Sequence, residues 1–162
     1  MKRILILGGV ISLLLSQNLS AGNILKGGLR IKPSDGEFAE KWLLAFEKNY
    51  SLASLMSIGY EIQGAYHKID DSFSEIMGNV FLKGKVKLPT LGFGPFIGGG
   101  IGLISNLSFN GETDWNIHTG FELGGGLELG VGGVGVLGEI MAIKSFKTGS
   151  KFSYYILAGI KF

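Results

Sequence analysis

Long stretches of this sequence alternate apolar and polar residues with a period of two, and no other feature restricts the fold as strongly. In the clearest stretch, residues 56–67, Ile58 and Tyr60 alternate with Gly59 and Glu61. The same period returns in residues 76–88 and 115–129. Because successive side chains of a strand point to opposite faces, each stretch forms a strand with one apolar and one polar face. The sequence therefore predicts an all-β protein.

Counting these stretches gives eight expected strands. Residues 38–48 are the least clear, because residues 39–44 also suit the start of a helix; the alternation of Trp42, Leu44 and Phe46 favours a strand. Several stretches match the roughly 9–11 residues of a tilted membrane strand better than the roughly five or six residues of a soluble one. The expected strands span residues 24–32, 38–48, 54–68, 75–88, 92–108, 114–129, 131–145 and 151–162.

Short polar segments separate these strands and fit hairpin connections. One set comprises residues 33–36, 70–72, 110–112 and 147–150. It alternates along the chain with a second set at residues 49–51, 89–92 and 130–133. Turn sequences at every junction predict an antiparallel, up-and-down order. If these strands form a membrane barrel with both termini in the periplasm, the first set faces outside the cell, and its loops are short for a barrel of that kind.

The first 21 residues have the three parts of a secretory signal peptide. Lys2 and Arg3 are basic, residues 4–15 are apolar, and a polar stretch with small residues ends at Ala21. The apolar run is too short for a membrane helix. We therefore expect residues 1–21 to be removed after Ala21 and residues 22–162 to form the mature domain. A retained N-terminal anchor helix is the alternative.

The composition of the mature domain excludes several classes of protein. Loss of Lys2 and Arg3 reduces 15 basic residues to 13, which balances the 13 acidic residues, so no nucleic-acid partner is expected. The absence of cysteine excludes disulfides and thiolate metal sites. No stretch after residue 21 offers the roughly 18 apolar residues of a membrane helix. Since only helices and closed barrels satisfy their backbone within lipid, this hydrophobic chain is predicted to be an eight-stranded antiparallel up-and-down transmembrane β-barrel.

Two features indicate that the apolar faces of the strands meet lipid. The polar faces are rich in glycine with isolated charges, as suits a crowded lumen. Aromatic residues gather towards the strand ends, as in the interfacial girdles of membrane barrels. These residues are Trp42, Tyr50, Tyr66, Phe93, Trp115, Tyr154 and Phe162. The alternative is a soluble periplasmic ligand-binding barrel, in which the apolar faces would line a cavity.

If the apolar faces point outward, a set of charged residues of both signs points into the lumen. An unpaired charge there would be costly, so we expect a structural network of salt bridges; a narrow ion path is the functional alternative. An eight-stranded barrel is only just wide enough for its own side chains, which excludes a wide pore. The glycine runs at 98–100 and 124–126 make room for large lumenal neighbours. The expected network comprises Arg30, Glu61, Lys83, Lys85, Glu122, Glu128 and Glu139.

A catalytic site is not expected from the positions of the two histidines in the sequence. The residues two positions after His67 and His118 are Ile69 and Gly120, so no serine shares their strand face at that spacing. His118 and Glu122 share a face but stand about 13 Å apart. Ser105 or Ser108 could approach His118 across the hairpin, depending on register.

Metal and cofactor sites are not expected either. Two isolated histidines without a carboxylate at ligand spacing are a weak signal for a metal. The neighbouring acids Asp70 and Asp71 could hold a divalent cation, but a solvated turn is the simpler interpretation. No cofactor is expected.

The final strand places Tyr154, Ile160 and Phe162 on one face, with the aromatic residue last. On this ending and the alternation of residues 22–162, the chain resembles the small outer-membrane β-barrels, the class of outer-membrane proteins A and X and the opacity-type porin-like proteins. The resemblance implies that the terminal strand is read by the outer-membrane assembly machinery. It also implies contact with outer-membrane lipids and lipopolysaccharide. We expect a structural or narrow porin-like role; a lipid A-modifying acyl hydrolase or transferase is the alternative.

Overall fold

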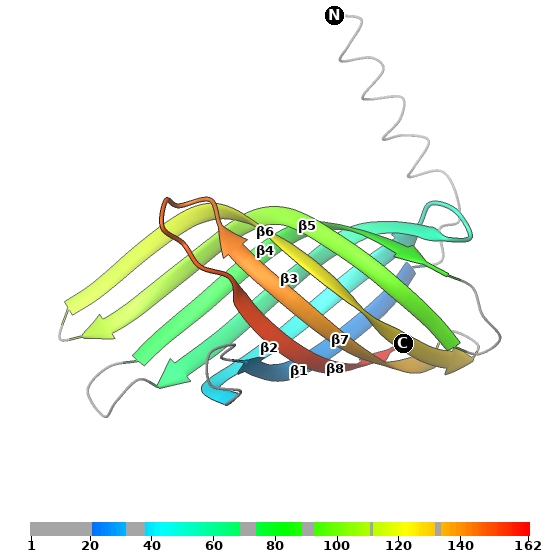
Figure 1. Cartoon of the computed structure of the whole chain (residues 1–162), viewed down its shortest axis with the longest axis horizontal. Helices are drawn as coiled ribbons and strands as arrows, with labels where there is room; N and C mark the ends of the chain where they lie inside the picture. The colour runs from blue at the N-terminus through cyan, green and yellow to red at the C-terminus, as the bar shows by residue number, and fades with distance from the viewer. Residues whose placement is uncertain (1–20, 32–37, 69–73, 89–92, 111, 132–133) are drawn as a thin grey trace, which may run out of the picture.

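The computed structural model describes residues 21–31, 38–68, 74–88, 93–110, 112–131 and 134–162, which form a closed barrel (Figure 1). Each strand pairs antiparallel with its neighbours in sequence, and β1 closes the barrel against β8. The strands are β1 (Ala21–Ile31), β2 (Phe38–Ser51), β3 (Met56–Lys68), β4 (Ser74–Lys87), β5 (Phe93–Asn110), β6 (Glu112–Val131), β7 (Val134–Ser145) and β8 (Ser153–Lys161). The predicted all-β, eight-stranded antiparallel fold is confirmed.

The strand boundaries differ from the prediction by up to three residues. β2 extends to Ser51, because Tyr50 and Ser51 pair with Ile58 and Ser57 instead of forming a turn. β7 begins at Val134 rather than at residue 131, and β1 begins at Ala21 rather than at residue 24. The expected signal peptide, apart from Ala21, lies outside the described residues, as do the expected turns at 33–36, 70–72 and 89–92.

β2, whose first residues also suit a helix, shows the strict alternation of a barrel wall. Leu43 is fully buried, whereas the neighbouring Leu44 is 67% exposed and Trp42 is 63% exposed. A helix would not separate adjacent residues so completely, because its faces repeat every 3.6 residues. No helix in the described part of the chain is long and apolar enough to cross a membrane.

The outer face of the barrel is apolar and the inner face carries the charges. Large apolar side chains stand exposed on every strand, whereas ten polar or charged side chains of the described residues are buried inside. Exposed apolar side chains and buried charges are the reverse of what a soluble barrel shows, although apolar side chains also lie inside this barrel, in two clusters. Outward residues on successive strands include Leu25, Leu44, Ile62, Leu82, Ile101, Leu123, Ile140 and Ile160.

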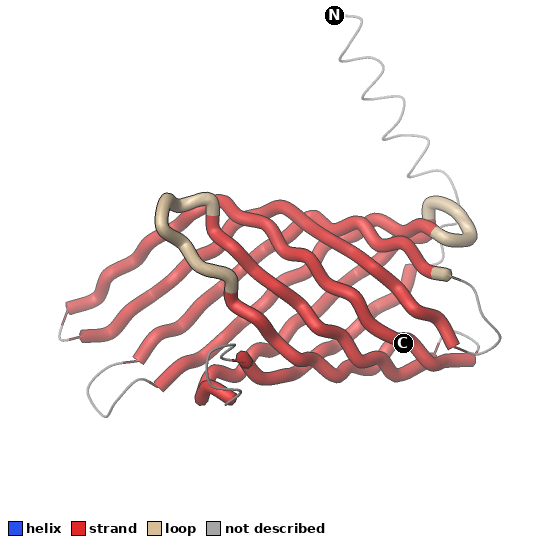
Figure 2. Tube along the Cα trace, viewed as in Figure 1, coloured by secondary structure: helices blue, strands red, loops and turns tan. Residues whose placement is uncertain are grey.

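One tight connection depends on a glycine. Residues 147–150, predicted as a turn, join β7 to β8, and the amide of Ser150 donates to the carbonyl of Lys147 at 3.1 Å. Gly149 has a φ of +79°, in the left-handed region that glycine adopts without a steric penalty. Figure 2 shows this connection as the loop at the end of the barrel away from the C-terminus.

Candidate functional site

The lumen is the candidate functional site, and its side chains are stacked in layers. We call the end of the barrel that holds Ala21 and Phe162 the terminal end, and the opposite end the distal end. Along β7, Leu137, Glu139 and Met141 follow one another on the inner face. Leu137 belongs to a small apolar cluster with Ile24 and Phe96. Met141 belongs to a larger one with Leu43, Phe81, Ile104, Tyr155, Leu157 and four others. Charged side chains occupy the layer between them.

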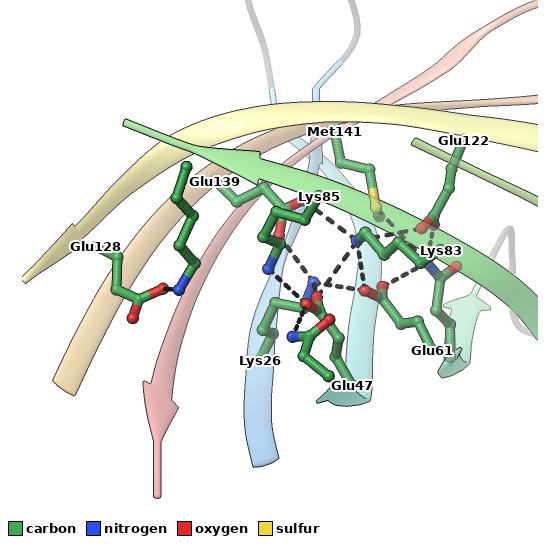
Figure 3. A network of polar contacts seen from close by, with 12 residues as sticks. Lys26, Glu47, Glu61, Lys83, Lys85, Glu122, Glu128, Glu139 and Met141 are labelled. Atoms are coloured by element: carbon green, nitrogen blue, oxygen red, sulfur yellow. Dashed lines mark hydrogen bonds and ion pairs between the residues drawn. The ribbon is translucent and has the colours of Figure 1, made fainter. Parts of the chain in front are cut away.

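The charged layer, which we call the lumenal charge network, contains three lysines and four glutamates. Each is at most 2% exposed. They come from β1, β2, β3, β4, β6 and β7, so the network ties most of the barrel wall together. Figure 3 shows the side chains converging on the barrel axis from opposite walls. The members are Lys26, Glu47, Glu61, Lys83, Lys85, Glu122 and Glu139.

Two lysines form the centre of the network. The Lys26 ammonium lies 2.5 Å from Glu47, 2.5 Å from Glu61 and 2.8 Å from Glu139. The Lys83 ammonium contacts the same three carboxylates, at 2.6 Å for Glu61 and 3.4 Å for the other two. Lys83 also lies 3.1 Å from Glu122. Lys83 is therefore the one network lysine in contact with all four carboxylates.

Neutral side chains complete the network. Gln63 donates its amide to Glu61 and Glu122, both at 2.7 Å, and accepts from Asn79 at 2.9 Å. Glu47 accepts hydrogen bonds from Lys85 and Asn49. Buried charges are tolerated when they are paired and hydrogen-bonded in this way.

A second ionic group lies at the terminal mouth of the lumen. Glu128 pairs with Lys161 at 2.8 Å and also with Lys87. The two lysine side chains are 26% and 30% exposed, so water reaches this group. A cavity of about 370 Å³ opens beside it; its lining includes Lys87, Lys161 and Asn49, whose amide donates to Glu47, but none of the seven charged network residues. The cavity is therefore a vestibule at the mouth and not a passage through the barrel.

A third ionic group lies towards the distal end. The Lys41 ammonium is 3.2 Å from Glu75, and the His67 ring nitrogen is 4.0 Å from the same carboxylate. Arg30 also lies at this end, in register with Tyr155 of β8. The large apolar cluster separates this group from the lumenal charge network.

The structure brings together five of the seven predicted lumenal residues. Those five are Glu61, Lys83, Lys85, Glu122 and Glu139. Glu128 faces inward but belongs to the mouth group, and Arg30 lies near the distal end. Sequence reasoning missed Lys26, Glu47, Gln63 and Asn79. The alternation of side chains along β2 could have identified Glu47 as inward, because it shares a face with Leu43 and Ala45. Pairing of β2 with β3 then places Glu47 opposite Glu61.

The glycine runs serve the lumen as predicted, but only through alternate residues. A Cβ atom on Gly100 would lie 3.3 Å from the Glu122 carboxylate, and one on Gly124 would lie 2.6 Å from the Glu139 carboxylate. The middle residues of the two runs, Gly99 and Gly125, belong to the outer face, because successive residues of a strand point to opposite faces. Glycine at the inward positions leaves the space that the glutamate side chains occupy.

The register separates the histidine and serine residues that a hydrolase would need. His118 faces Ile104 across the hairpin. Ser105 points to the outer face, where its hydroxyl accepts from the Trp115 indole at 2.7 Å. Ser108 pairs with Asp114, four residues from His118 along β6. Among the described residues, no group of three or more histidine and acidic side chains could hold a metal ion. Asp70 and Asp71 lie outside the described residues.

The three residues of the expected assembly signal lie at the seam where β8 meets β1. Ile160 and Phe162 are 52% and 55% exposed, and Tyr154 is half-buried. Ile160 pairs with Leu25 of β1. The geometry places these side chains on the outer face, and their role in assembly remains a prediction.

The lysines that pair with Glu128 at the mouth are partly exposed, whereas the lumenal charge network is buried, so removing a carboxylate should cost less stability at the mouth. Glu128→Gln should lower the free energy of unfolding by at most about 1 kcal/mol, because its lysine partners remain hydrated. Glu61→Gln should cost about 3–5 kcal/mol, because two buried ammonium groups lose their shared carboxylate. Urea unfolding in detergent micelles, followed by tryptophan fluorescence, measures both. Equal losses would mean that water reaches the network as freely as the mouth.

Comparison with solved structures finds the same architecture in several proteins. Neisserial surface protein A matches with a TM-score of 0.71 at 13% identity, over 87% of this chain and 94% of that one. The chain has the fold of the small outer-membrane β-barrels. The attachment invasion locus protein of Yersinia pestis matches with a TM-score of 0.59 at 11% identity, covering 88% of this chain and 97% of that one.

The matching structures include an enzyme. The outer membrane enzyme PagL also matches, with a TM-score of 0.54 at 12% identity, over 86% of this chain and 97% of that one. The same fold thus serves a surface protein, an attachment and invasion protein, and an enzyme. No protein-family model matches the chain, and no curated protein sequence does.

Proposed function

We propose that this protein is a non-enzymatic, structural barrel of the bacterial outer membrane whose lumen is closed. The observation that carries the proposal is the lumenal charge network. Seven charged side chains, each at most 2% exposed, fill one layer of the lumen between two apolar clusters. A solute crossing the barrel would have to separate ion pairs that have no water to replace their partners. This supports a structural role over narrow porin-like passage.

The outer surface supports residence in the outer membrane. Outward leucine, isoleucine and valine side chains surround the barrel, and a closed barrel leaves no unpaired sheet edge in lipid. We place the terminal end in the periplasm and the distal end outside, with residues 1–21 removed on export. The outward Ile160 and Phe162 would then be available to the outer-membrane assembly machinery.

Conductance across planar lipid bilayers tests the closed lumen. Protein that has been folded into detergent, and that migrates differently on a gel before and after boiling, is added to the bilayer. We expect no stepwise conductance above that of the detergent alone, because the network blocks the lumen. Reproducible, stable conductance steps from the folded fraction would instead establish a pore and contradict the proposal.

A lipid-hydrolysis assay tests the non-enzymatic part. The folded barrel is incubated with lipopolysaccharide and phospholipid, and released fatty acid is measured. We expect no release above background, because Ser105 and His118 lie on opposite faces of the barrel wall. Release that disappears in His118→Asn but persists in His67→Asn would show that the barrel is an enzyme.

A further inference from the structure

The vestibule at the terminal mouth has polar side-chain atoms that no described residue satisfies. Asn49 of β2 and Ser57 of β3 both line it. The Asn49 Oδ1 atom and the Ser57 Oγ atom are buried, and neither has a hydrogen-bond partner among the described residues. The Asn49 amide nitrogen donates to Glu47, which fixes the other end of the side chain as an acceptor. The vestibule therefore offers a ligand an unpaired acceptor and an unpaired hydroxyl.

Two lysines of the vestibule share a single carboxylate. Lys87 of β4 and Lys161 of β8 both line the cavity, and both pair with Glu128. Neither lysine has a second acidic partner among the described side chains. Phe162 also lines the cavity, but its terminal carboxylate forms no ion pair with either lysine. Because an ammonium group has three donor hydrogens, each lysine can donate to a further, anionic acceptor.

Apolar side chains form another part of the lining, and backbone hydrogen bonds hold the segment that carries two of them. Leu55 lies in the connection between β2 and β3, which Figure 2 shows as the loop at the right-hand end of the barrel, and Met56 begins β3. The amide of Lys87 donates to the carbonyl of Leu55 at 2.7 Å, and the amide of Leu52 donates to the carbonyl of Met56 at 2.9 Å. Val134 of β7 adds to the lining. Since the cavity is already formed, little ordering is needed when a ligand binds.

We propose that the vestibule binds the C-terminal end of a peptide whose last side chain is apolar. The α-carboxylate accepts charge-assisted hydrogen bonds from Lys87 and Lys161. The N–H of the last residue donates to Asn49 Oδ1, and the last side chain packs against Met56 and Val134. The volume of about 370 Å³ lies within the roughly 300–1,000 Å³ of small-molecule pockets. A fatty acid also has a carboxylate and an apolar chain, but it has no N–H for Asn49. Only the compartment rests on the proposed function, which places this end in the periplasm.

Ser57→Ala separates a binding role of the vestibule from a structural one. The Ser57 hydroxyl has no partner among the described residues, so alanine should leave the resistance of the barrel to urea unchanged or raise it. In the proposed complex the same hydroxyl donates to a carbonyl of the peptide. The substitution should therefore weaken peptide binding by about fivefold, the usual effect of one neutral hydrogen bond. A purely structural serine would not lower affinity while stability is kept.

The test titrates the isotope-labelled barrel in lipid nanodiscs and follows its amide signals by NMR. The probes are acetyl-glycyl-leucine, its C-terminal amide, its ester analogue with oxygen in place of the leucine N–H, and octanoate. We expect saturable shifts with acetyl-glycyl-leucine at residues that line the vestibule, and at least about fivefold weaker binding of the other three probes, each of which lacks one partner group. Lys161→Gln should weaken binding by about tenfold, because it removes a charged donor. Lys48→Gln is the matched control: its ammonium lies 5.5 Å from the centre of the Tyr50 ring near the same end, outside the cavity, and its loss should leave affinity unchanged.

The outcomes separate this proposal from the proposed function. Each protein is first checked for the heat-induced gel shift and for incorporation into nanodiscs; a wild-type protein that fails to incorporate contradicts the membrane barrel itself. If the barrel incorporates but acetyl-glycyl-leucine gives no saturable shifts, the peptide site alone is wrong. Equal affinity for the amide or the ester would also overturn it, as would wild-type affinity in Lys161→Gln or an equal loss in Lys48→Gln. Equal binding of octanoate would show a fatty-acid site in place of the peptide site.

Discussion

Lys83→Met is expected to lower the free energy of unfolding by about 3–5 kcal/mol, the usual cost of breaking a buried ion pair from one side. Lys83 contacts all four network carboxylates and is buried. Methionine preserves most of the side-chain volume, so the loss reports the charge and not a cavity. Urea titration of the barrel in detergent micelles measures the change, with tryptophan fluorescence and the heat-induced gel shift as independent readouts.

Two further variants show whether the charge itself causes this loss. Lys48→Met removes an ammonium group on the outer wall and should change stability by less than about 0.5 kcal/mol. The double variant Lys83→Met/Glu122→Gln removes one charge of each sign and should regain part of the loss, since contacting residues do not contribute additively. If Lys83→Met cost no more than Lys48→Met, the network would be hydrated and the closed lumen would be wrong.

Gly102→Ala is expected to cost about 3 kcal/mol or to prevent folding, because the added methyl group overpacks the wall. A Cβ atom at Gly102 would lie 1.9 Å from the carbonyl oxygen of Val80 and 2.8 Å from the Cα atom of Phe81. Both are backbone atoms of the paired strand β4, so no side-chain rotation relieves the contact. β5 and β4 would have to move apart in the centre of the barrel.

Gly78→Ala provides the matched control on β4. Nothing lies within 4 Å of a Cβ atom at that position, so the change should stay within about 0.5 kcal/mol of wild type. Unfolding in urea and the yield of heat-shifted barrel compare the two variants directly. Equal behaviour of Gly78→Ala and Gly102→Ala would contradict the close approach of β4 and β5 at Gly102.

The barrel was predictable from the sequence because every strand of a membrane barrel must present apolar side chains to the lipid. Each strand has an outer face of large apolar residues, and the period of two along residues such as Ile58, Tyr60 and Ile62 shows it directly. The order of the strands followed from the turn sequences between them. Even β2, whose first residues also suit a helix, shows its outward face through Trp42 and Leu44.

The lumen was predictable only in part, because its inner faces do not have a uniform composition. Buried Leu43, Phe81 and Tyr155 share those faces with lysines and glutamates, so an inward residue cannot be identified by polarity alone. For this reason Lys26 and Glu47 were not predicted to belong to the network. The pairing of charged side chains across the lumen also depends on how far each strand is shifted along the barrel axis. A single sequence does not specify this shift. Arg30 and Lys83 face the same lumen but lie in different layers.

The central claim is a membrane barrel with an apolar outside and a sealed inside, and single-cysteine labelling tests it most directly. The chain has no native cysteine, so a cysteine is placed at outward Ile140, at inward Ala45 or in the loop at Thr148. The folded protein in liposomes is exposed to a water-soluble maleimide, and each variant is labelled again after unfolding in denaturant. We predict that only Thr148→Cys reacts while the barrel is folded, and that all three react once it is unfolded. Rapid labelling of Ile140→Cys in the folded protein would put the apolar face in water, and rapid labelling of Ala45→Cys would show an open lumen; either result would contradict the account.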